Sequence, residues 1–315
     1  MLYVFAEAMY PLPQKIRSRT SMGRSEKRGL ARLRASVARR SKTFVSDCFI
    51  LLMRVAARRL PLPFALRAAA TLLEGQGFGS GTSLEISGEK AVFSLIHSAN
   101  PMLVDVGANK GDYTVAFLAR HPNGRAVMVE PSSVNVAELK RKFAGDSRVT
   151  LVACAVGAES GRATLFADKP GSGLASLTQR RLDHVGITMT PEEVVQVCTL
   201  DSILANAGQI ALLKIDIEGH ELAALRGAKE VINRGSVDMI QFEFGGSNLD
   251  TRTTLQDFFY TLPQFEISVI APRRISPLSH YSEMFEHYRT TNYLARRKAK
   301  ASEVVLLPSL SGRQG

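Results

Sequence analysis

From about residue 85 onward, short apolar runs alternate with segments whose apolar residues recur every three to four positions. The short runs are typical of buried strands, and the three-to-four spacing is typical of helices that cover a sheet with one face. This alternation predicts βαβ units and hence a parallel sheet. We expect helices at 89–98, 112–120, 133–143, 199–206, 220–233 and 252–261, and strands at 102–106, 126–130, 149–153, 210–215, 237–242, 265–270 and 293–296.

Two segments depart from the regular winding. Residues 155–198 are less regular, and we expect a β insertion there that includes the loop at 171–177. The strands at 265–270 and 293–296 are joined without an obvious crossover helix, which suggests an antiparallel hairpin at the sheet edge. The predicted fold class is α/β, with a doubly wound, mostly parallel seven-stranded sheet, an antiparallel edge hairpin and a basic N-terminal extension.

The positive charge of the chain is concentrated at its N-terminal end. Residues 1–73 hold 15 Lys and Arg against 3 acids, whereas the remaining residues hold 25 against 26. A near-neutral body argues against a long polyanion lying across it, so we expect no nucleic-acid partner. A glycine cluster from Gly75 to Gly81 marks the boundary. We expect an extension at 1–75, a folded domain at 85–300 and a tail at 301–315.

Most of residues 1–43 are expected to be disordered, because they are rich in Arg and Ser and poor in acids. Residues 44–73 are compatible with basic amphipathic helices broken at Pro61 and Pro63. A solvated tail or an overextended start of translation is the favoured interpretation. Contact with an anionic membrane surface and an organelle transit peptide stay open as alternatives.

Three widely separated cysteines indicate neither a disulfide framework nor a zinc ribbon, and they fit a reducing compartment. The longest apolar stretch near the N-terminus, Phe44–Val55, is interrupted by Asp47 and Arg54 and is shorter than the roughly 20 residues that a spanning helix needs. We expect no transmembrane segment. The predicted location is cytoplasmic, with peripheral membrane contact through the basic segment as an alternative.

A glycine loop follows the strand at 102–106, in the sequence VDVGANKGDYT at 104–114. Asp105, Gly107 and Gly111 form the pattern DxGxxxG. A tight turn before a helix N-terminus favours a polar or anionic ligand. The dinucleotide pattern GxGxxG is absent, which moves the expected ligand toward S-adenosylmethionine. The expected cofactor-binding residues in this loop are Asp105, Gly107, Ala108, Asn109, Gly111 and Tyr113.

Three further strand ends carry polar residues, and the carboxyl ends of parallel strands meet at one edge of a sheet. Glu130 follows Gly111 by 19 residues. At about this distance from the glycine loop, nucleotide-binding folds carry a carboxylate that accepts hydrogen bonds from the ribose hydroxyls. The strand ending at Ile215 leads into Asp216, Glu218, His220 and Glu221, and Glu221 is explained by the helix dipole alone. Glu243 lies among aromatic residues at the fourth strand end.

Several other chemistries are excluded by spacing. HELAA at 220–224 lacks the second His of a zinc protease helix, and neither a GxSxG elbow nor a GxxxxGK[ST] loop occurs. Hydrolase and phosphate-transfer functions are therefore not expected, and no metal site is predicted.

The chain resembles the FkbM family of S-adenosylmethionine-dependent methyltransferases, which have the Rossmann-like class I methyltransferase fold. The resemblance covers about residues 85–297 and rests on VDVGANKGDYT at 104–114, VEP at 129–131, TLDSIL at 199–204, LLKIDIEGHELAALRGA at 212–228, QFEF at 241–244 and NYLA at 292–295. It implies that Asp105, Gly107, Asn109 and Gly111 cradle the methionine part of the cofactor, that Glu130 binds its ribose, and that Asp216 lies beside the methyl group. It further implies that Lys214, Glu218, His220 and Glu243 face the acceptor. The implied reaction is O-methylation of a hydroxyl on a small molecule, sugar, other glycan or lipid, such as a glycolipid.

Among these residues, His220 is best suited to act as general base, since an imidazole titrates near pH 6.5. Asp216 is expected to orient the reactants. A Mg²⁺-assisted route through Asp216, Glu218 and Glu243 is the less favoured alternative. Two other functions stay open on the same fold, a nucleotide-binding dehydrogenase or epimerase and a nucleic-acid methyltransferase. The missing GxGxxG loop argues against the first, and the scarcity of aromatic residues for base stacking argues against the second.

Overall fold

The computed structural model describes residues 47, 50–51, 53–80, 84 and 86–299. The predictions for residues 1–43 and for the tail at 301–315 fall outside these residues. The chain divides into two units, Met1–Thr71 and Leu72–Gly315, and the second contains both sheets.

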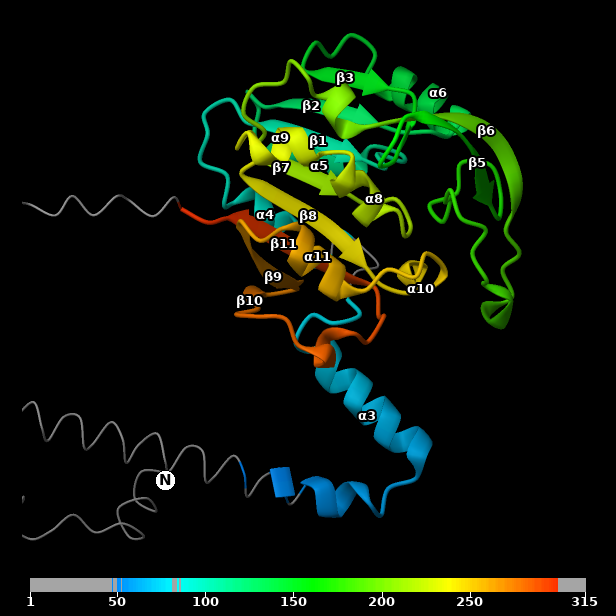
Figure 1. The fold of residues 1–315 in the computed structure, drawn as a ribbon, viewed down its shortest axis with the longest axis vertical. Helices are drawn as coiled ribbons and strands as arrows, with labels where there is room; N and C mark the ends of the chain where they lie inside the picture. Colours follow the sequence, from blue (N-terminus) through cyan, green and yellow to red (C-terminus); the bar gives the residue numbers. More distant parts are fainter. Residues whose placement is uncertain (1–46, 48–49, 52, 81–83, 85, 300–315) are drawn as a thin grey trace, which may run out of the picture. The chain divides into compact units, whose positions relative to one another are not determined.

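An eight-stranded sheet forms the centre of the second unit (Figure 1). Its order is β10-β9-β11-β8-β7-β1-β2-β3, and the adjacent strands β8, β7, β1, β2 and β3 are parallel to one another. The bounds are β1 Met102–Val106, β2 Arg125–Val129, β3 Val149–Val152, β7 Leu212–Ile215, β8 Met239–Phe244, β9 Phe265–Ala271, β10 Arg274–Pro277 and β11 Thr291–Arg297. The order reverses between β1 and β7, which is where a doubly wound sheet opens a ligand crevice.

The predicted strand count and the predicted edge are both wrong. The short strand β10 adds an eighth strand and occupies the edge through its antiparallel pairing with β9. The expected antiparallel pairing of the strands near 265–270 and 293–296 is confirmed, as β9 with β11. However, β11 lies between β9 and β8 and pairs antiparallel with both. Its residues Tyr293, Leu294 and Ala295 are accordingly fully buried.

Helices cover both faces of the sheet (Figure 1). On one face, α7, α8, α9 and α11 pack leucine, valine, isoleucine and phenylalanine side chains onto β1, β7 and β8. On the other face, α4 and α5 pack against the same strands. The bounds are α4 Lys90–Phe93, α5 Asp112–Arg120, α6 Ser133–Lys142, α7 Leu200–Ile203, α8 Glu221–Arg226, α9 Lys229–Asn233, α10 Ser247–Asp250 and α11 Leu255–Thr261, with 3-10 turns η2 Asp183–Val185 and η3 Glu283–Phe285.

The single helix predicted at 220–233 is divided into α8 and α9. A Cβ at Gly227 would collide with the backbone carbonyl of Gly157, so another chain segment lies directly against the break. The carbonyl of Gly227 also accepts a hydrogen bond from the N–H of Asp201 at 2.8 Å. The helix therefore ends because of contacts with segments distant in sequence.

The segment at 155–198 forms a second, three-stranded sheet in the order β4-β6-β5. Its strands are β4 Ala155–Val156, β5 Gly161–Ala167 and β6 Thr190–Cys198. The expected β insertion is thus confirmed. The connection from β5 to β6 contains residues 168–189 and carries side chains to the carboxyl ends of β1 and β7, as described below.

The helix α3, Leu62–Glu74, follows residues 53–57, which are also helical. The predicted break occurs at Pro61, but Pro63 lies in the first turn of α3, where a missing backbone N–H costs no hydrogen bond. In the described part of the chain, every helix is too short or too polar to span a bilayer.

Candidate active site

Two adjoining cavities open at the carboxyl ends of β1, β2, β7 and β8. The smaller has a volume of about 90 Å³ and is lined by Glu130, Cys154, Ser176 and His220, among others. The larger has a volume of about 550 Å³ and is lined by Glu89, Arg180, Lys214 and Glu243, among others. Both share Gly107, Asn109, Gly173, Asp216 and Glu218. These five residues therefore form the junction between the two cavities.

The glycine loop is held close to the end of β7. Gly107 has a φ of 80°, and a Cβ there would collide with the backbone carbonyl of Asp216. Only glycine therefore allows the loops after β1 and β7 to approach this closely. Asn109 also has a positive φ, 47°, which asparagine tolerates better than most residues.

The backbone N–H groups of this loop are already paired within the protein. Those of Gly107 and Ala108 both donate to the carbonyl of Val129, at 2.9 and 3.1 Å, and that of Gly111 donates to the carbonyl of Ala108 at 2.7 Å. The N–H of Asn109 donates to Glu130 Oε2 at 2.8 Å. The N–H groups of Gly107, Ala108, Asn109 and Gly111 therefore fix the shape of the loop.

Glu130 is positioned by three donors at the end of β2. Besides Asn109 N–H, its carboxylate accepts from the backbone N–H of Ser132 at 3.0 Å and from Asn135 Nδ2 at 3.3 Å. Its side chain is buried and lines the smaller cavity. Burial raises the pKa of Glu130, and the donors from Asn109 and Ser132 oppose that rise. Each carboxylate oxygen accepts more than one hydrogen bond, so Glu130 can also accept ligand hydroxyls.

A row of buried polar residues crosses three neighbouring strands beneath the junction. In the sheet register Asp105 lies opposite Lys214, and Lys214 lies opposite Gln241. Lys214 Nζ is 3.8 Å from Asp105 Oδ1 and 3.1 Å from Asp216 Oδ2. Asp105 is fully buried, and its other oxygen accepts from Thr114 Oγ1 at 2.7 Å. The ammonium group of Lys214 therefore forms ion pairs with both the buried Asp105 and the partly exposed Asp216.

The row continues toward α4 through a chain of hydrogen bonds. Tyr113 Oη donates to Gln241 Oε1 at 2.7 Å, and Gln241 Nε2 donates to Glu89 Oε2 at 2.6 Å. Glu89 also accepts from Ser87 Oγ at 2.8 Å. The ring of Tyr113 lies 5.1 Å from Lys214 Nζ. Tyr113 therefore lines the larger cavity through its ring, while its hydroxyl is engaged beneath.

Two residues predicted to contact the cofactor lie outside both cavities. Asp105 is enclosed by Lys214 and Thr114, and its carboxylate lies beside the ammonium of Lys214, which lines the larger cavity. A Cβ at Gly111 would meet Leu139 and Phe143, so Gly111 faces α6. Gly111 precedes α5 with a φ of 75° and therefore belongs to the turn that starts the helix.

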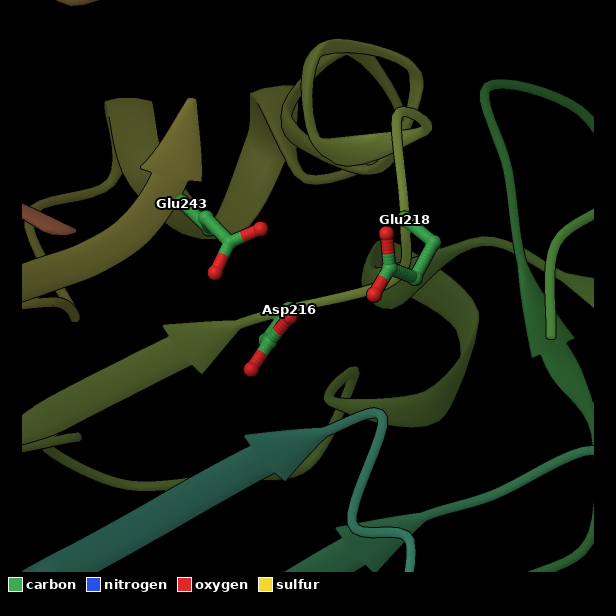
Figure 2. A group of neighbouring side chains, drawn as sticks. All are labelled: Asp216, Glu218 and Glu243. Atoms are coloured by element: carbon green, nitrogen blue, oxygen red, sulfur yellow. The ribbon is translucent and has the colours of Figure 1, made fainter. Parts of the chain in front are cut away.

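Three carboxylates converge on the junction: Asp216 and Glu218 follow β7, and Glu243 lies in β8 (Figure 2). One oxygen from each lies within 4.8 Å of the other two. Burial, followed by the charge of Asp216, raises the pKa of Glu218 to about 8, although Arg180 Nη1 lies 2.5 Å from Glu218 Oε2. Burial and Asp216 also raise the pKa of Glu243 well above its usual range. The cluster therefore favours a bound proton or another cation.

Glu218 and His220 occupy the turn between β7 and α8. Glu218 has a φ of 52°, in the left-handed region. The turn is fixed by Glu221, whose Oε1 accepts from the backbone N–H groups of Ile217 and Gly219, both at 3.0 Å. His220 Nε2 lies 2.9 Å from Thr178 Oγ1. Burial lowers the pKa of His220, which favours the neutral imidazole.

The structure thus brings the predicted residues to the same end of the sheet, but it distributes them between the two cavities. Lys214 and Glu243 line the larger cavity, His220 lines the smaller, and Asp216 and Glu218 line both. The sequence argument missed Glu89, Thr178 and Arg180. Thr178 and Arg180 belong to the irregular insertion, and Glu89 precedes a four-residue helix, so no motif identifies them.

The chain is similar to known methyltransferases. The family model of the Methyltransferase FkbM domain matches residues 105–288. The 2-O-methyltransferase NoeI of Sinorhizobium fredii is 23% identical over 199 residues, which cover 59% of this chain and 81% of that protein. Methyltransferase 1 of Beauveria bassiana is 27% identical over 142 residues, which cover 40% of this chain and 57% of that protein.

A solved structure is also similar. The crystal structure of Methyltransferase FkbM from Methylobacillus flagellatus KT is 21% identical, with a TM-score of 0.40. That match covers 63% of this chain and 44% of the other. The chain therefore spans less than half of the crystallised protein and little more than half of the Beauveria relative.

Proposed function

This chain belongs to the FkbM methyltransferase family, and from that premise we propose that it transfers the methyl group of S-adenosylmethionine to a hydroxyl group. The proposed acceptor is a small molecule, a sugar or a glycolipid. The observation that carries the proposal is the convergence of Glu130, Asp216 and Glu218 on two joined cavities where the strand order reverses. S-adenosylmethionine would supply a methyl group that is already activated on a sulfonium, so the protein has to align the reactants and remove a proton.

In this proposal the smaller cavity receives the adenosine part of the donor. Glu130 would accept hydrogen bonds from the ribose hydroxyls, because its carboxylate is held in place by Asn109, Ser132 and Asn135 and lines that cavity. Asp216, at the junction, would place negative charge beside the sulfonium, and that cation would in turn favour the ionised form of the neighbouring Glu218. The larger cavity would receive the acceptor. The name of the Sinorhizobium relative, a 2-O-methyltransferase, supports oxygen as the methylated atom.

We keep His220 as the general base and Asp216 as the orienting group. A base must be unprotonated at the pH of the reaction, and burial of His220 favours its neutral form. Burial and the charge of Asp216 raise the pKa of Glu243, which favours its protonated, hydrogen-bond-donating form. Lys214 holds Asp216 through their 3.1 Å contact. Thr178 would keep the imidazole in place through its hydroxyl.

The carboxylate cluster supports one variation on this mechanism. Asp216, Glu218 and Glu243 together offer hard oxygen ligands of the kind Mg²⁺ takes, and a cation there would offset their repulsion. Activity that is lost on chelation and restored by Mg²⁺ alone would establish the metal-assisted route. Activity unchanged in the presence of a chelator would leave the reaction to His220.

The proposed function is tested first by cofactor binding. Calorimetric titration should show binding of S-adenosylmethionine and no binding of NAD, and the reverse result would favour a dehydrogenase or epimerase. The protein is then incubated with methyl-labelled donor and extracts fractionated into lipids, glycans and nucleic acids. Label in the glycan or lipid fraction supports the proposal, whereas label confined to nucleic acid would overturn it.

A further inference from the structure

The segment from residue 53 to residue 74, which we call the N-terminal apolar segment, exposes an unusual amount of apolar surface. The helix α3 within it buries none of its residues. The exposed large apolar side chains and their exposed fractions are Met53 46%, Val55 47%, Leu60 40%, Leu62 69%, Phe64 59%, Leu66 61% and Leu72 65%. So many exposed large apolar side chains in one short segment indicate a surface that binds something.

Four apolar residues of α3 form a row along one side of the helix. Leu62, Leu66, Ala69 and Leu73 follow one another at intervals of four, three and four residues, which places them on one face. Leu72 lies beside this row. The polar residues of the helix fall on the opposite side, together with Phe64. Thirteen residues extend about 20 Å, less than the roughly 30 Å of a bilayer core. A helix of this length and pattern suits a position along an interface.

The charge of the N-terminal apolar segment indicates what kind of surface it binds. Residues 53–74 contain four basic residues, Arg54, Arg58, Arg59 and Arg67, and one acidic residue, Glu74, at the end of α3. An apolar face next to arginines matches a bilayer that carries negative headgroups, because both features are satisfied by one surface. A second copy of this chain fits less well. The chain as a whole carries a net charge of +11, and residues 74–315, with 26 acidic against 25 basic residues, are nearly neutral and offer little attraction to the arginines.

We propose that the N-terminal apolar segment binds the surface of an anionic phospholipid bilayer. The helix α3 lies along the membrane, with Leu62, Leu66 and Leu72 among the acyl chains. The arginines meet the phosphates of the headgroups. This inference is independent of the proposed reaction, since none of these residues lines either cavity.

The test is flotation of the full chain with vesicles of phosphatidylcholine alone and of phosphatidylcholine mixed with phosphatidylglycerol. One variant replaces Leu62, Leu66 and Leu72 with glutamine, which keeps helix propensity. Its matched control replaces three exposed apolar residues elsewhere, Leu249, Tyr260 and Met284, with glutamine. A second variant replaces Arg54, Arg58 and Arg67 with glutamine. Its control changes the exposed residues Lys140, Lys229 and Arg273 in the same way.

Binding should require phosphatidylglycerol and should fall about tenfold for each leucine and about fivefold for each arginine replaced, with both controls unchanged. In molar salt, where the Debye length is about 3 Å, wild type should still bind better than the leucine variant, because the apolar contribution is not screened. Equal binding to both vesicles, or wild-type binding by the leucine variant, would overturn the proposal. Concentration-dependent self-association that the leucine variant abolishes, without vesicle binding, would identify a second copy as the partner instead.

Discussion

Replacement of Lys214 by methionine tests the buried polar row most directly. Lys214 is 6% exposed, and its ammonium lies between Asp105 and Asp216. Methionine has a similar length and keeps the packing against Tyr113 while it removes the charge. Asp105 would then be fully buried with Thr114 as its hydrogen-bond donor and no cation beside it.

The expected loss of unfolding free energy follows from the difference in burial between Asp105 and Asp216. Loss of one partner from a buried ion pair costs about 3–5 kcal/mol of unfolding free energy, because the remaining charge is uncompensated. The side chain of Asp216 is 36% exposed, so water can replace its lost contact and its share is small. The expected destabilisation of about 3–5 kcal/mol therefore comes almost entirely from Asp105.

Equilibrium unfolding in urea measures this cost, on Lys214→Met, Asp105→Asn and the double variant. The double variant should regain much of the stability that Lys214→Met loses, since it has neither charge. Burial already raises the pKa of Asp105 above 3.8, and without Lys214 opposing it the pKa rises further. A raised acid pKa means that stability is highest at low pH and falls as pH rises toward the folded-state value. A single variant within 1 kcal/mol of wild type, or a double variant no better than the single, refutes the ion-pair argument.

Glu130→Gln should weaken S-adenosylmethionine binding by about one to two orders of magnitude in calorimetry, because a charged acceptor for two ribose hydroxyls is lost. 2′,3′-Dideoxy analogues of the cofactor, which lack the ribose hydroxyls, should bind both proteins equally. His220→Ala should lower kcat by about 10²- to 10⁴-fold with cofactor affinity unchanged, whereas Thr178→Val should lower it much less. Full turnover by His220→Ala would show that another group is the base. The pKa of Glu218 is about 8 in the folded protein against an ordinary 4.5, so its ionisation opposes folding, and stability should fall as pH rises from 4.5 to 8. Glu218→Gln should flatten that dependence in urea unfolding, and an unchanged slope would contradict it.

The parts of the fold that depend on local pattern were predictable. β1 and α5 have the bounds expected from the apolar run at 102–106 and the helical spacing at 112–120, because burial alone decides them. β10 was missed, since Arg274–Pro277 contains one large apolar residue and owes its pairing to β9. The break between α8 and α9 depends on Gly157, which is 70 residues away in the sequence.

In the candidate site, too, the features set by local sequence were predictable and those set by distant contacts were not. The polar residues at strand ends were identifiable because parallel strands end at one edge of the sheet. Their partners were not, since the contacts of Lys214 follow from the register that sets it opposite Asp105 and Gln241. Whether a loop amide is free for a ligand also depends on neighbouring strands, and Val129 takes two of the amides that the motif made available.

The backbone at residue 218 has a consequence for attempts to stabilise this protein. Glutamate there adopts a φ of 52°, a conformation that glycine enters at lower cost, and it sits in a cluster of like charges. Selection for thermal resistance alone should therefore favour glycine at this position and discard the carboxylate. The most stable sequence for this turn is then not the one best suited to catalysis, and libraries screened for melting temperature need an activity screen beside it.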